Sequence, residues 1–130
     1  LNQSRKQPIS IIIGDMDDLK SINDSYGHKV GDDYIKKCAE IFKSVTRAED
    51  IVARIGGDEF AVILAETTAH QAGRLIDRIH KKRKEINQEE MLPEPLHISL
   101  GQATMTDSSQ DLNKIFDKAD RKMYQNKFKK

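Results

Sequence analysis

The sequence predicts one α/β domain, α+β in the finer classification, in which helices flank a central mixed or antiparallel sheet. The first indication is the nearly continuous apolar run at residues 9–14, which is typical of a strand buried on both faces. The second is a pair of strand-like runs at 50–55 and 60–64, whose short separation predicts a hairpin. The third is the helical spacing of apolar residues in the segments between strands. Because a hairpin requires antiparallel strands, the order strand-helix-helix-strand-strand-helix-strand-helix excludes a purely parallel doubly wound sheet.

The first three helices are predicted from apolar spacing and from the residues at their ends. The first covers residues 17–26 and ends at Gly27, which suits the position after a helix C-terminus. The second covers residues 32–46, and the third begins at Thr68, which has capping-box spacing to Gln71. The buried stripe of the second helix is Ile35, Cys38, Ala39, Phe42 and Val45. The inward positions of the third helix are Ala72, Leu75, Ile76, Ile79 and Ile86.

The C-terminal part is predicted to add one strand and one helix. Pro93 and Pro95 interrupt the chain before a strand at residues 96–104. Its alternating positions are Leu96, Ile98 and Leu100 on one face and His97 and Ser99 on the other. The last helix is expected to start near Ser108 or Ser109. Its expected buried positions are Leu112, Ile115, Phe116, Ala119 and Met123.

Composition and charge restrict the class of protein. A chain of 130 residues with 37% hydrophobic and 33% charged residues fits one soluble domain. The aliphatic run at 11–13 is far too short to span a bilayer, and a single cysteine, Cys38, excludes an internal disulfide, so the expected location is the cytoplasm. The net charge of +1 argues against nucleic-acid binding, and the basic run at 81–84 is expected to be a solvated helix face. The chain begins at Leu1 rather than at methionine, which suggests a piece of a longer protein.

The turn between the two hairpin strands is the first candidate functional site. Gly56 and Gly57 can both adopt positive φ in a tight turn, which would place Asp58 and Glu59 side by side at its tip. Two adjacent carboxylates repel each other, and a hard cation such as Mg²⁺ between them relieves that repulsion. The alternative interpretation is a turn whose acidic residues only aid solubility.

A further carboxylate, that of Asp15, ends the first predicted strand. If the hairpin lies beside that strand, Asp15 meets the two turn carboxylates at one edge of the sheet. The amides of the helix that begins near Asp17 would then receive phosphate oxygens, and Lys20 would add a positive charge. Such an arrangement suits phosphoryl or nucleotidyl transfer. The alternative for Asp17 and Asp18 is that they are ordinary acidic residues of a first helical turn.

Four segments of the chain resemble the signatures of GGDEF-domain diguanylate cyclases. Residues 54–60 read RIGGDEF and carry the motif that names the family, and residues 15–32 resemble its first signature. Residues 98–101 resemble its last strand, and residues 119–127 its last helix. The resemblance implies a palm-like fold related to nucleotidyl cyclases and polymerase palms. It also implies that two GTP molecules are condensed into cyclic di-GMP, with release of pyrophosphate, by two domains that face each other in a homodimer of the parent protein.

The resemblance implies a role for each carboxylate of the candidate site. Asp15 and Asp58 match metal-binding carboxylates, with the carbonyl of Met16 as a further ligand. Glu59 matches a residue that deprotonates the attacking 3′-hydroxyl or holds a second metal ion, and the sequence leaves these alternatives open. The implied cofactor is Mg²⁺ or Mn²⁺, with two ions per active site. The turn residues that complete the motif are Gly56, Gly57 and Phe60.

For GTP, the resemblance implies contacts to the base and to the phosphates. Asn23 and Asp32 match the guanine-binding pair, and a carboxylate acceptor suits the N–H donors on the Watson–Crick edge of guanine. The alternative role of Asp32 is the N-cap of the second helix. His28 would support the nucleotide-binding loop. The other implied GTP-binding positions are Asp17, Asp18, Leu19, Lys20 and, for phosphate, Lys127.

A product-inhibition site is implied by Arg47 and Asp50, which match an Arg-x-x-Asp pattern of the family, with Arg78 as a second contact. A guanidinium group and a carboxylate suit the phosphate and the guanine of cyclic di-GMP. The alternative for Arg47 and Asp50 is a charged helix end without a ligand.

The chain also departs from the family pattern. Leu19 occupies a position that is more often aromatic, and the chain ends at Lys130, before the usual Gly-Arg. The family's opening segment is missing before Leu1, so we expect one GGDEF domain at 1–130, truncated at both ends and less active as an isolated piece. The competing hypothesis is a catalytically weak or inactive module that binds GTP or cyclic di-GMP, although both turn carboxylates are present. An enzyme for another nucleotide is disfavoured by the guanine-binding pair.

Overall fold

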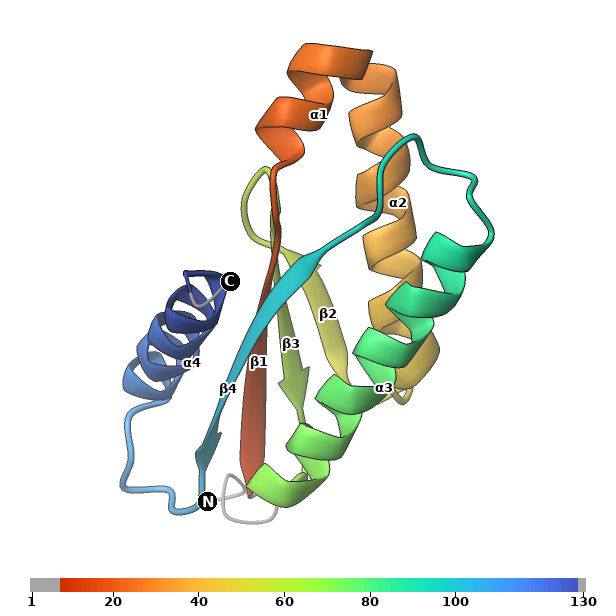
Figure 1. Ribbon diagram of the computed structural model, residues 1–130. Coiled ribbons are helices and arrows are strands. Elements are labelled where there is room, and N and C mark those ends of the chain that lie inside the picture. The colour runs from red at the N-terminus through yellow and green to blue at the C-terminus, as the bar shows by residue number, and fades with distance from the viewer. Residues whose placement is uncertain (1–7, 129–130) are drawn as a thin grey trace.

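The computed structural model describes residues 8–128, which form a four-stranded sheet and four helices (Figure 1). In chain order the elements are β1 (Ile9–Met16), α1 (Leu19–Tyr26), α2 (His28–Val45), β2 (Ile51–Arg54), β3 (Glu59–Leu64), α3 (Ala69–Gln88), β4 (Ile98–Met105) and α4 (Leu112–Lys127). The strand order is β2-β3-β1-β4, and each neighbouring pair is antiparallel. The predicted order of elements and the predicted hairpin are confirmed, and the sheet is antiparallel rather than mixed.

The two faces of the sheet contribute to two separate hydrophobic cores. Ile12 of β1 belongs to the larger core together with side chains of α2 and α3, such as Phe42. Ile11 and Ile13 belong to the smaller core, which is closed by residues of α4 such as Ala119. Figure 1 shows the same division, with α2 and α3 on one side of the sheet and α4 on the other. Because β1 is covered on both faces, its sequence is apolar at consecutive positions.

Helix α1 begins later than the sequence predicted. Asp17 precedes it, and Asp18 is its N-cap residue, with a left-handed φ of 63° and no hydrogen bond from its side chain to the helix. The first turn of α1 contains no acidic residue. The interpretation of Asp17 and Asp18 as ordinary first-turn residues is therefore wrong, and the first helical amides belong to residues that follow them.

Helix α2 begins earlier than predicted, at His28. A single residue, Gly27, separates it from α1, and Gly27 has a φ of 92° that glycine adopts without steric cost. Asp32 consequently lies inside α2, so the N-cap role considered for it is wrong. The predicted stripe of α2 is confirmed, with Cys38, Phe42 and Val45 buried and Ile35 and Ala39 partly buried.

The predicted start of α3 is confirmed, and the predicted start of α4 is wrong. Thr68 and Gln71 form the predicted capping box at the start of α3. Helix α4 begins at Leu112 rather than near Ser108, because the carboxylate of Asp111 accepts a hydrogen bond from the amide of Asn113. The expected burial of Leu112 is wrong, since this side chain is 40% exposed. The buried positions of α4 are Ile115, Ala119 and Met123, with Phe116 partly buried, and those of α3 are Ala72 and Ile79, with Leu75, Ile76 and Ile86 partly buried.

Two smaller expectations concern the cysteine and the basic run. Cys38 is fully buried, and burial raises the pKa of its thiol, which fits a core role. Of the basic run at 81–84, only Arg83 is partly buried, where its guanidinium donates a hydrogen bond of 3.3 Å to the carbonyl of Leu96. Among residues 8–128, no helix is both long enough and apolar enough to cross a membrane.

The segment that leads into β4 is tied to α1, α2 and α3 by side-chain hydrogen bonds. The hydroxyl of Tyr34 donates to the carbonyl of Glu94 at 2.6 Å and accepts from the amide of Glu94 at 2.9 Å. The hydroxyl of Tyr26 donates to the carboxylate of the same Glu94. The carboxamide of Asn87 bonds both the amide and the carbonyl of Leu96, at 2.8 and 3.0 Å. These bonds fix the helical hairpin of α1 and α2 relative to the start of β4.

Candidate active site

The antiparallel register brings the candidate carboxylates together at one end of the two central strands, β1 and β3. Asp15 in β1 lies directly opposite Glu59 in β3. The amide of Met16 donates a hydrogen bond of 2.8 Å to the carbonyl of Asp58. Asp15 is thus a neighbour of Asp58 and Glu59, which are more than 40 residues away in the sequence, and the condition set in the sequence analysis, that the hairpin lies beside the first strand, is met.

The turn that carries the motif is wider than a tight two-residue hairpin. The amides of Ile55 and Gly56 both donate to the carbonyl of Glu59, at 2.9 and 3.3 Å. The guanidinium of Arg54 closes the turn by donating to the carbonyls of Gly56 and Gly57. Neither glycine has the positive φ that the sequence analysis expected, since Gly27 is the one glycine in residues 8–128 with that conformation. The role of Arg54 was not predicted, although its place just before the glycines was visible.

Asp15 is buried, with 8% of its surface exposed. Its Oδ2 atom accepts a hydrogen bond of 3.0 Å from the ammonium group of Lys127 at the end of α4. Its Oδ1 atom is buried and has no hydrogen-bond partner. Burial raises the pKa of Asp15, the charge of Asp58 raises it further, and Lys127 opposes both effects. A buried carboxylate oxygen without a hydrogen-bond partner is unfavourable, and a bound cation would stabilise it.

Asp17 lies next to Asp15 and shares its lysine. The hydroxyl of Ser99 in β4 donates to both carboxylate oxygens of Asp17, at 2.9 and 3.1 Å. The ammonium of Lys127 is 3.9 Å from Asp17 Oδ1. The amide of Asp17 donates to the carbonyl of His97. Asp17 is therefore held by β4 and α4, and Ser99 is a partner that the sequence analysis did not identify.

Glu59 faces a carboxylate that the sequence analysis missed, that of Asp120 in α4. The pKa of Glu59 is raised to about 7, first by burial and then by a hydrogen bond with Asp120 and by its charge. Asp120 Oδ1 is buried without a partner. Asp120 precedes Lys127 by seven residues, which puts both on one face of a helix. The sequence showed that Asp120 and Lys127 share a helix face, but not that this face lies beside Glu59.

The candidate base-binding residues lie on the helical hairpin above the sheet edge (Figure 1). Asn23 Oδ1 is buried and has no hydrogen-bond partner. The carboxamide of Asn23 packs against Gly31, and a Cβ atom added to Gly31 would overlap its oxygen and lie 2.8 Å from its Cγ. Asp32 follows Gly31 directly and is exposed, as is His28. The tight approach of α1 to α2 at Gly31 places Asn23 and Asp32 on the same hairpin.

Three other predicted residues have structural roles. Leu19 is 7% exposed and belongs to the larger core, so it anchors α1. Phe60 is buried, and its ring lies 5.4 Å from that of Phe42. Lys20 is exposed and forms an ion pair of 3.3 Å with Asp24 in the next helical turn. The structure thus does not bring Lys20 to the carboxylates, whereas it does bring Lys127 there.

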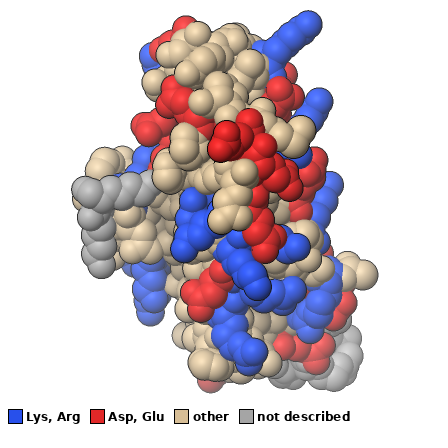
Figure 2. All heavy atoms as spheres, turned by 45° about the vertical axis from the view of Figure 1, so that its right-hand side comes forward, with Lys and Arg blue, Asp and Glu red and all other residues tan. Residues whose placement is uncertain are grey.

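A hollow of about 260 Å³ lies at the predicted product site and is lined by all three of its residues. Arg47, Asp50 and Arg78 all line it, and so does Arg74, one helical turn before Arg78. The guanidinium of Arg47 bonds the carboxylate of Asp50 and also the carbonyl of Ala65 and the hydroxyl of Thr67. On the face shown in Figure 2, Lys and Arg side chains are interspersed with Asp and Glu side chains.

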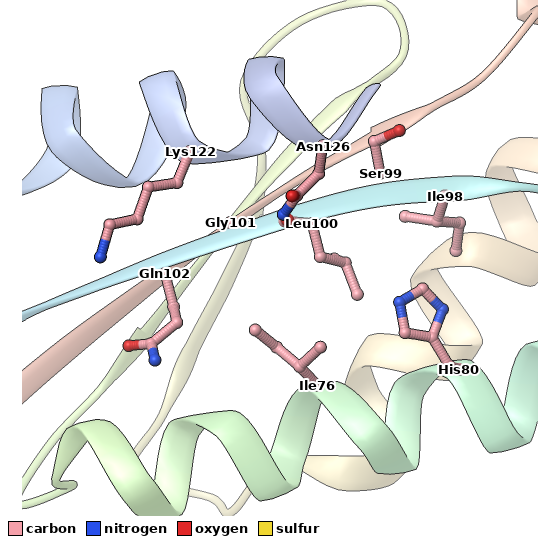
Figure 3. A pocket seen from close by; sticks show the side chains of 9 residues that line it. All are labelled: Ile76, His80, Ile98, Ser99, Leu100, Gly101, Gln102, Lys122 and Asn126. Carbon is pink, nitrogen blue, oxygen red and sulfur yellow. The ribbon is translucent and has the colours of Figure 1, made fainter. Parts of the chain in front are cut away.

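A hollow beside β4 is lined by none of the predicted site residues. It measures about 400 Å³ and lies between α3 and α4, at the strand that ends the sheet (Figure 3). His80 and Ile76 point into it from α3, and burial and the charge of Arg83 lower the pKa of His80. On the opposite side, the carboxamide of Asn126 donates a hydrogen bond of 2.6 Å to the carbonyl of Leu100.

Comparison with known proteins identifies the family of this chain. The chain resembles a probable diguanylate cyclase, DgcT, of Escherichia coli K12, with 33% identity over 127 residues. It resembles diguanylate cyclase A of Treponema denticola with 35% identity over 127 residues. Each alignment covers 95% of this chain, but the chain spans only 28% and 33% of the two relatives.

Solved structures of GGEEF and GGDEF domains have the same fold as this chain. The active GGEEF domain of a diguanylate cyclase from Vibrio cholerae superposes with a TM-score of 0.81 and 27% identity, over 95% of this chain and 79% of that one. A microbial GGDEF domain described in its interaction with bis-(3′,5′)-cyclic di-GMP superposes with a TM-score of 0.80 and 30% identity, over 98% and 75% of the two chains. The family model of the diguanylate cyclase GGDEF domain matches residues 1–130. The chain therefore belongs to the GGDEF family of diguanylate cyclases.

Proposed function

We propose that this chain is one catalytic domain that condenses two GTP molecules into cyclic di-GMP and releases pyrophosphate. The observation that supports this most is the pairing of Asp15 with Glu59 across β1 and β3, with Asp58 beside them. Because each product molecule contains two nucleotides, we propose that two copies of the domain face each other, each holding one GTP. We place the reaction in the cytoplasm, where GTP is supplied.

The carboxylates fit a divalent metal ion. Asp15 has a buried oxygen without a partner, and the charge of Asp58 is near enough to raise the pKa of Asp15, so a cation between them would stabilise both. Within residues 8–128, no three His, Cys, Asp or Glu side chains form a ready-made metal cluster. The further ligands would be the carbonyl of Met16, water and substrate phosphates, which is the ligand set that Mg²⁺ prefers. We assign Asp15, Met16 and Asp58 to one Mg²⁺ or Mn²⁺ ion and Glu59 to a second ion or to proton transfer.

When bound, the metal ions would polarise the α-phosphate of GTP and neutralise the charge that develops there. The part of Glu59 follows from its surroundings. Its pKa of about 7 lets this carboxylate accept a proton near neutral pH, which suits removal of the proton from the 3′-hydroxyl. We assign the binding of a phosphate oxygen to Lys127, whose ammonium group lies next to Asp15 and Asp17. The backbone amides at the start of α1, which follow Asp17 and Asp18, would receive phosphate oxygens of GTP.

Base selection is proposed for the hairpin of α1 and α2. The partner-free oxygen of Asn23 and the carboxylate of Asp32 are acceptors for the N–H groups of guanine, and His28 lies at the start of the same helix. Adenine presents an acceptor where guanine presents a donor, so it would leave a polar group unpaired. Asp32→Ser should relax discrimination against ATP, because a hydroxyl can donate as well as accept. If ATP competes equally well with GTP in the unmutated protein, this assignment is wrong.

Catalysis is tested by incubating the protein with GTP and Mg²⁺ or Mn²⁺ and separating the products by chromatography. We expect cyclic di-GMP, at a rate per monomer that rises with protein concentration. Glu59→Gln should lower the rate by roughly 10²- to 10⁴-fold, whereas Asp117→Asn, an exposed carboxylate of α4, should not. GTP binding without product, even when two copies are joined into a dimer, would instead support the second candidate function.

That second candidate is a receptor that binds GTP or cyclic di-GMP without turnover. The hollow lined by Arg47, Asp50 and Arg78 favours a ligand-binding role of this kind. We propose that in the active enzyme the same hollow binds cyclic di-GMP and inhibits synthesis. Arg47 also bonds Ala65 and Thr67, so its removal perturbs the fold. Arg78, which is exposed, is the cleaner test: Arg78→Ala should weaken product binding in calorimetry by about tenfold and leave GTP turnover unchanged.

A further inference from the structure

The feature that carries a further inference is the position of the Lys127 ammonium group. It lies 3.0 Å from Asp15 Oδ2 and 3.9 Å from Asp17 Oδ1. The side chains of the two aspartates are 12% and 7% exposed, and that of Lys127 is 26% exposed. The lysine therefore contacts Asp15, which the proposed function assigns to the metal ion, and lies beside Asp17, which precedes the proposed phosphate-binding amides of α1.

This contact has a clear electrostatic reason. Asp15 is buried near Asp58 and Glu59, and burying several like charges without a counter-charge is unfavourable. The ammonium of Lys127 supplies a positive charge from the last turn of α4, a different element from the strands that carry the carboxylates. In the protein as described, a lysine thus fulfils the charge-neutralising role that a metal ion would have.

A metal ion and the ammonium cannot share these oxygens freely. Asp15 Oδ1 has no partner and could take the metal ion, but the ammonium of Lys127 already bonds Oδ2 of the same carboxylate. The two cations would then lie close together and repel each other. A lysine, however, is a point charge on a flexible four-carbon stem, so its ammonium can move without moving the helix. The phosphates of a metal-bound nucleotide would be the nearest new anions for it, because Mg²⁺ keeps substrate phosphates among its ligands.

We propose that Lys127 is an exchangeable internal cation: it neutralises Asp15 and Asp17 before substrate binds, and it moves to a phosphate when metal and nucleotide enter together. This inference rests on the proposed function. It implies that metal alone binds weakly, because it displaces Lys127 from its partner. It also implies that metal and nucleotide strengthen each other's binding, and that this coupling depends on Lys127 and is reciprocal.

The test measures binding rather than turnover. Mn²⁺ binding is followed by electron paramagnetic resonance in the wild type and in Lys127→Met, with and without a non-hydrolysable GTP analogue. Without nucleotide, Lys127→Met should bind Mn²⁺ about tenfold more tightly, a change within the usual range of coupling between sites. With the analogue present, the advantage should disappear, because the lost ammonium no longer contacts phosphate.

The matched control is Lys118→Met, which removes the same charge from an exposed position of the same helix. If Lys118→Met tightens Mn²⁺ binding as much as Lys127→Met, the effect is general electrostatics and the exchange is refuted. Unchanged or weaker Mn²⁺ binding in Lys127→Met also refutes it. Asp15→Asn distinguishes failure of the Lys127 exchange from failure of the proposed function. If this variant binds Mn²⁺ as well as the wild type, the metal assignment itself is wrong, and with it the proposed function.

A second measurement follows ligand binding in the wild-type protein and uses a variant only to assign one resonance. The lysines are labelled by reductive ¹³C-methylation, and the Lys127 resonance is identified by its loss in Lys127→Arg. Mg²⁺ together with the analogue should shift this resonance, and the shift should be larger than with either ligand alone. A Lys127 resonance that responds to neither ligand shows that the ion pair with Asp15 persists, which overturns the proposal.

Discussion

Replacing Gly31 by alanine should remove base recognition without loss of stability. Gly31 lies in α2, where its backbone has helical geometry, and alanine is favoured over glycine in a helix interior by about 1 kcal/mol. The added Cβ would, however, overlap Asn23 Oδ1 and lie 2.8 Å from Asn23 Cγ. Since Asn23 Oδ1 has no hydrogen-bond partner, its carboxamide can rotate away without breaking a bond to that oxygen. The fold then keeps its stability while Asn23 leaves its position.

The magnitude follows from the contacts that Asn23 would lose. A hydrogen bond left unmade to a buried partner costs roughly 1–3 kcal/mol, which corresponds to about 5- to 150-fold in affinity for GTP. Calorimetry with a non-hydrolysable GTP analogue measures this loss, and thermal unfolding measures stability. We expect the midpoint of unfolding of Gly31→Ala to be equal to or above that of the wild type.

The control for this prediction is Gly73→Ala in α3. A Cβ at Gly73 meets no atom within 4 Å, so this variant should gain the same helix preference and bind the analogue normally. If Gly31→Ala binds the analogue as well as Gly73→Ala does, Asn23 has no part in base recognition. If Gly31→Ala unfolds at a much lower temperature than the wild type, the carboxamide is fixed more firmly than its free oxygen indicates.

Three further predictions concern the remainder of the site. The pKa of Glu59 is about 7 in the metal-free fold and 4.5 in the unfolded chain, so the protonated carboxyl stabilises the fold. This stabilisation is complete below pH 4.5 and is lost as the pH rises through 7. Glu59→Gln should therefore flatten this part of the dependence of stability on pH, measured by urea titration. Gly101→Ala should destabilise the protein by about 1–3 kcal/mol in thermal unfolding, because its Cβ would lie 2.5 Å from the carbonyl of Ala119 in α4; an unchanged midpoint would contradict this packing. Tyr34→Phe removes both bonds to the backbone of Glu94 and should lower stability by about 1–3 kcal/mol; a loss below a few tenths of a kcal/mol would show that water replaces the hydroxyl.

The sequence was sufficient for those features that depend on local pattern. The continuous apolar run of β1 indicated burial on two faces, and the spacing of Thr68 and Gln71 indicated the start of α3; the structure confirms both. The sequence analysis expected Asp15 to meet Glu59 if the hairpin lies beside β1, and the strand register fulfils that condition. These predictions succeeded because neighbouring residues and strand pairing determine them.

Other features depended on contacts between distant elements. The start of α2 at His28 was missed because residues 28–33 are largely polar and show no buried stripe. The two helices are separated only by the positive φ of Gly27, which the apolar pattern does not reveal. The contact of Asp120 with Glu59 requires α4 to lie across the sheet edge, which the sequence does not specify. Leu112 is apolar but exposed: it is the first residue of α4, directly after the cap residue Asp111, and it does not belong to the smaller core.

The carboxamides of Asn87 and Asn126 have a consequence for the solution behaviour of the protein. Strand β4 ends the sheet, and an edge strand offers backbone groups to which another chain can add by β-pairing. Asn87 bonds both backbone groups of Leu96 just before β4, and Asn126 bonds the carbonyl of Leu100 within it. Two side chains thereby take the places of a neighbouring strand. Their replacement by leucine, which keeps the size but removes the amide, should leave the chemistry of the site intact and make the protein prone to edge-to-edge aggregation.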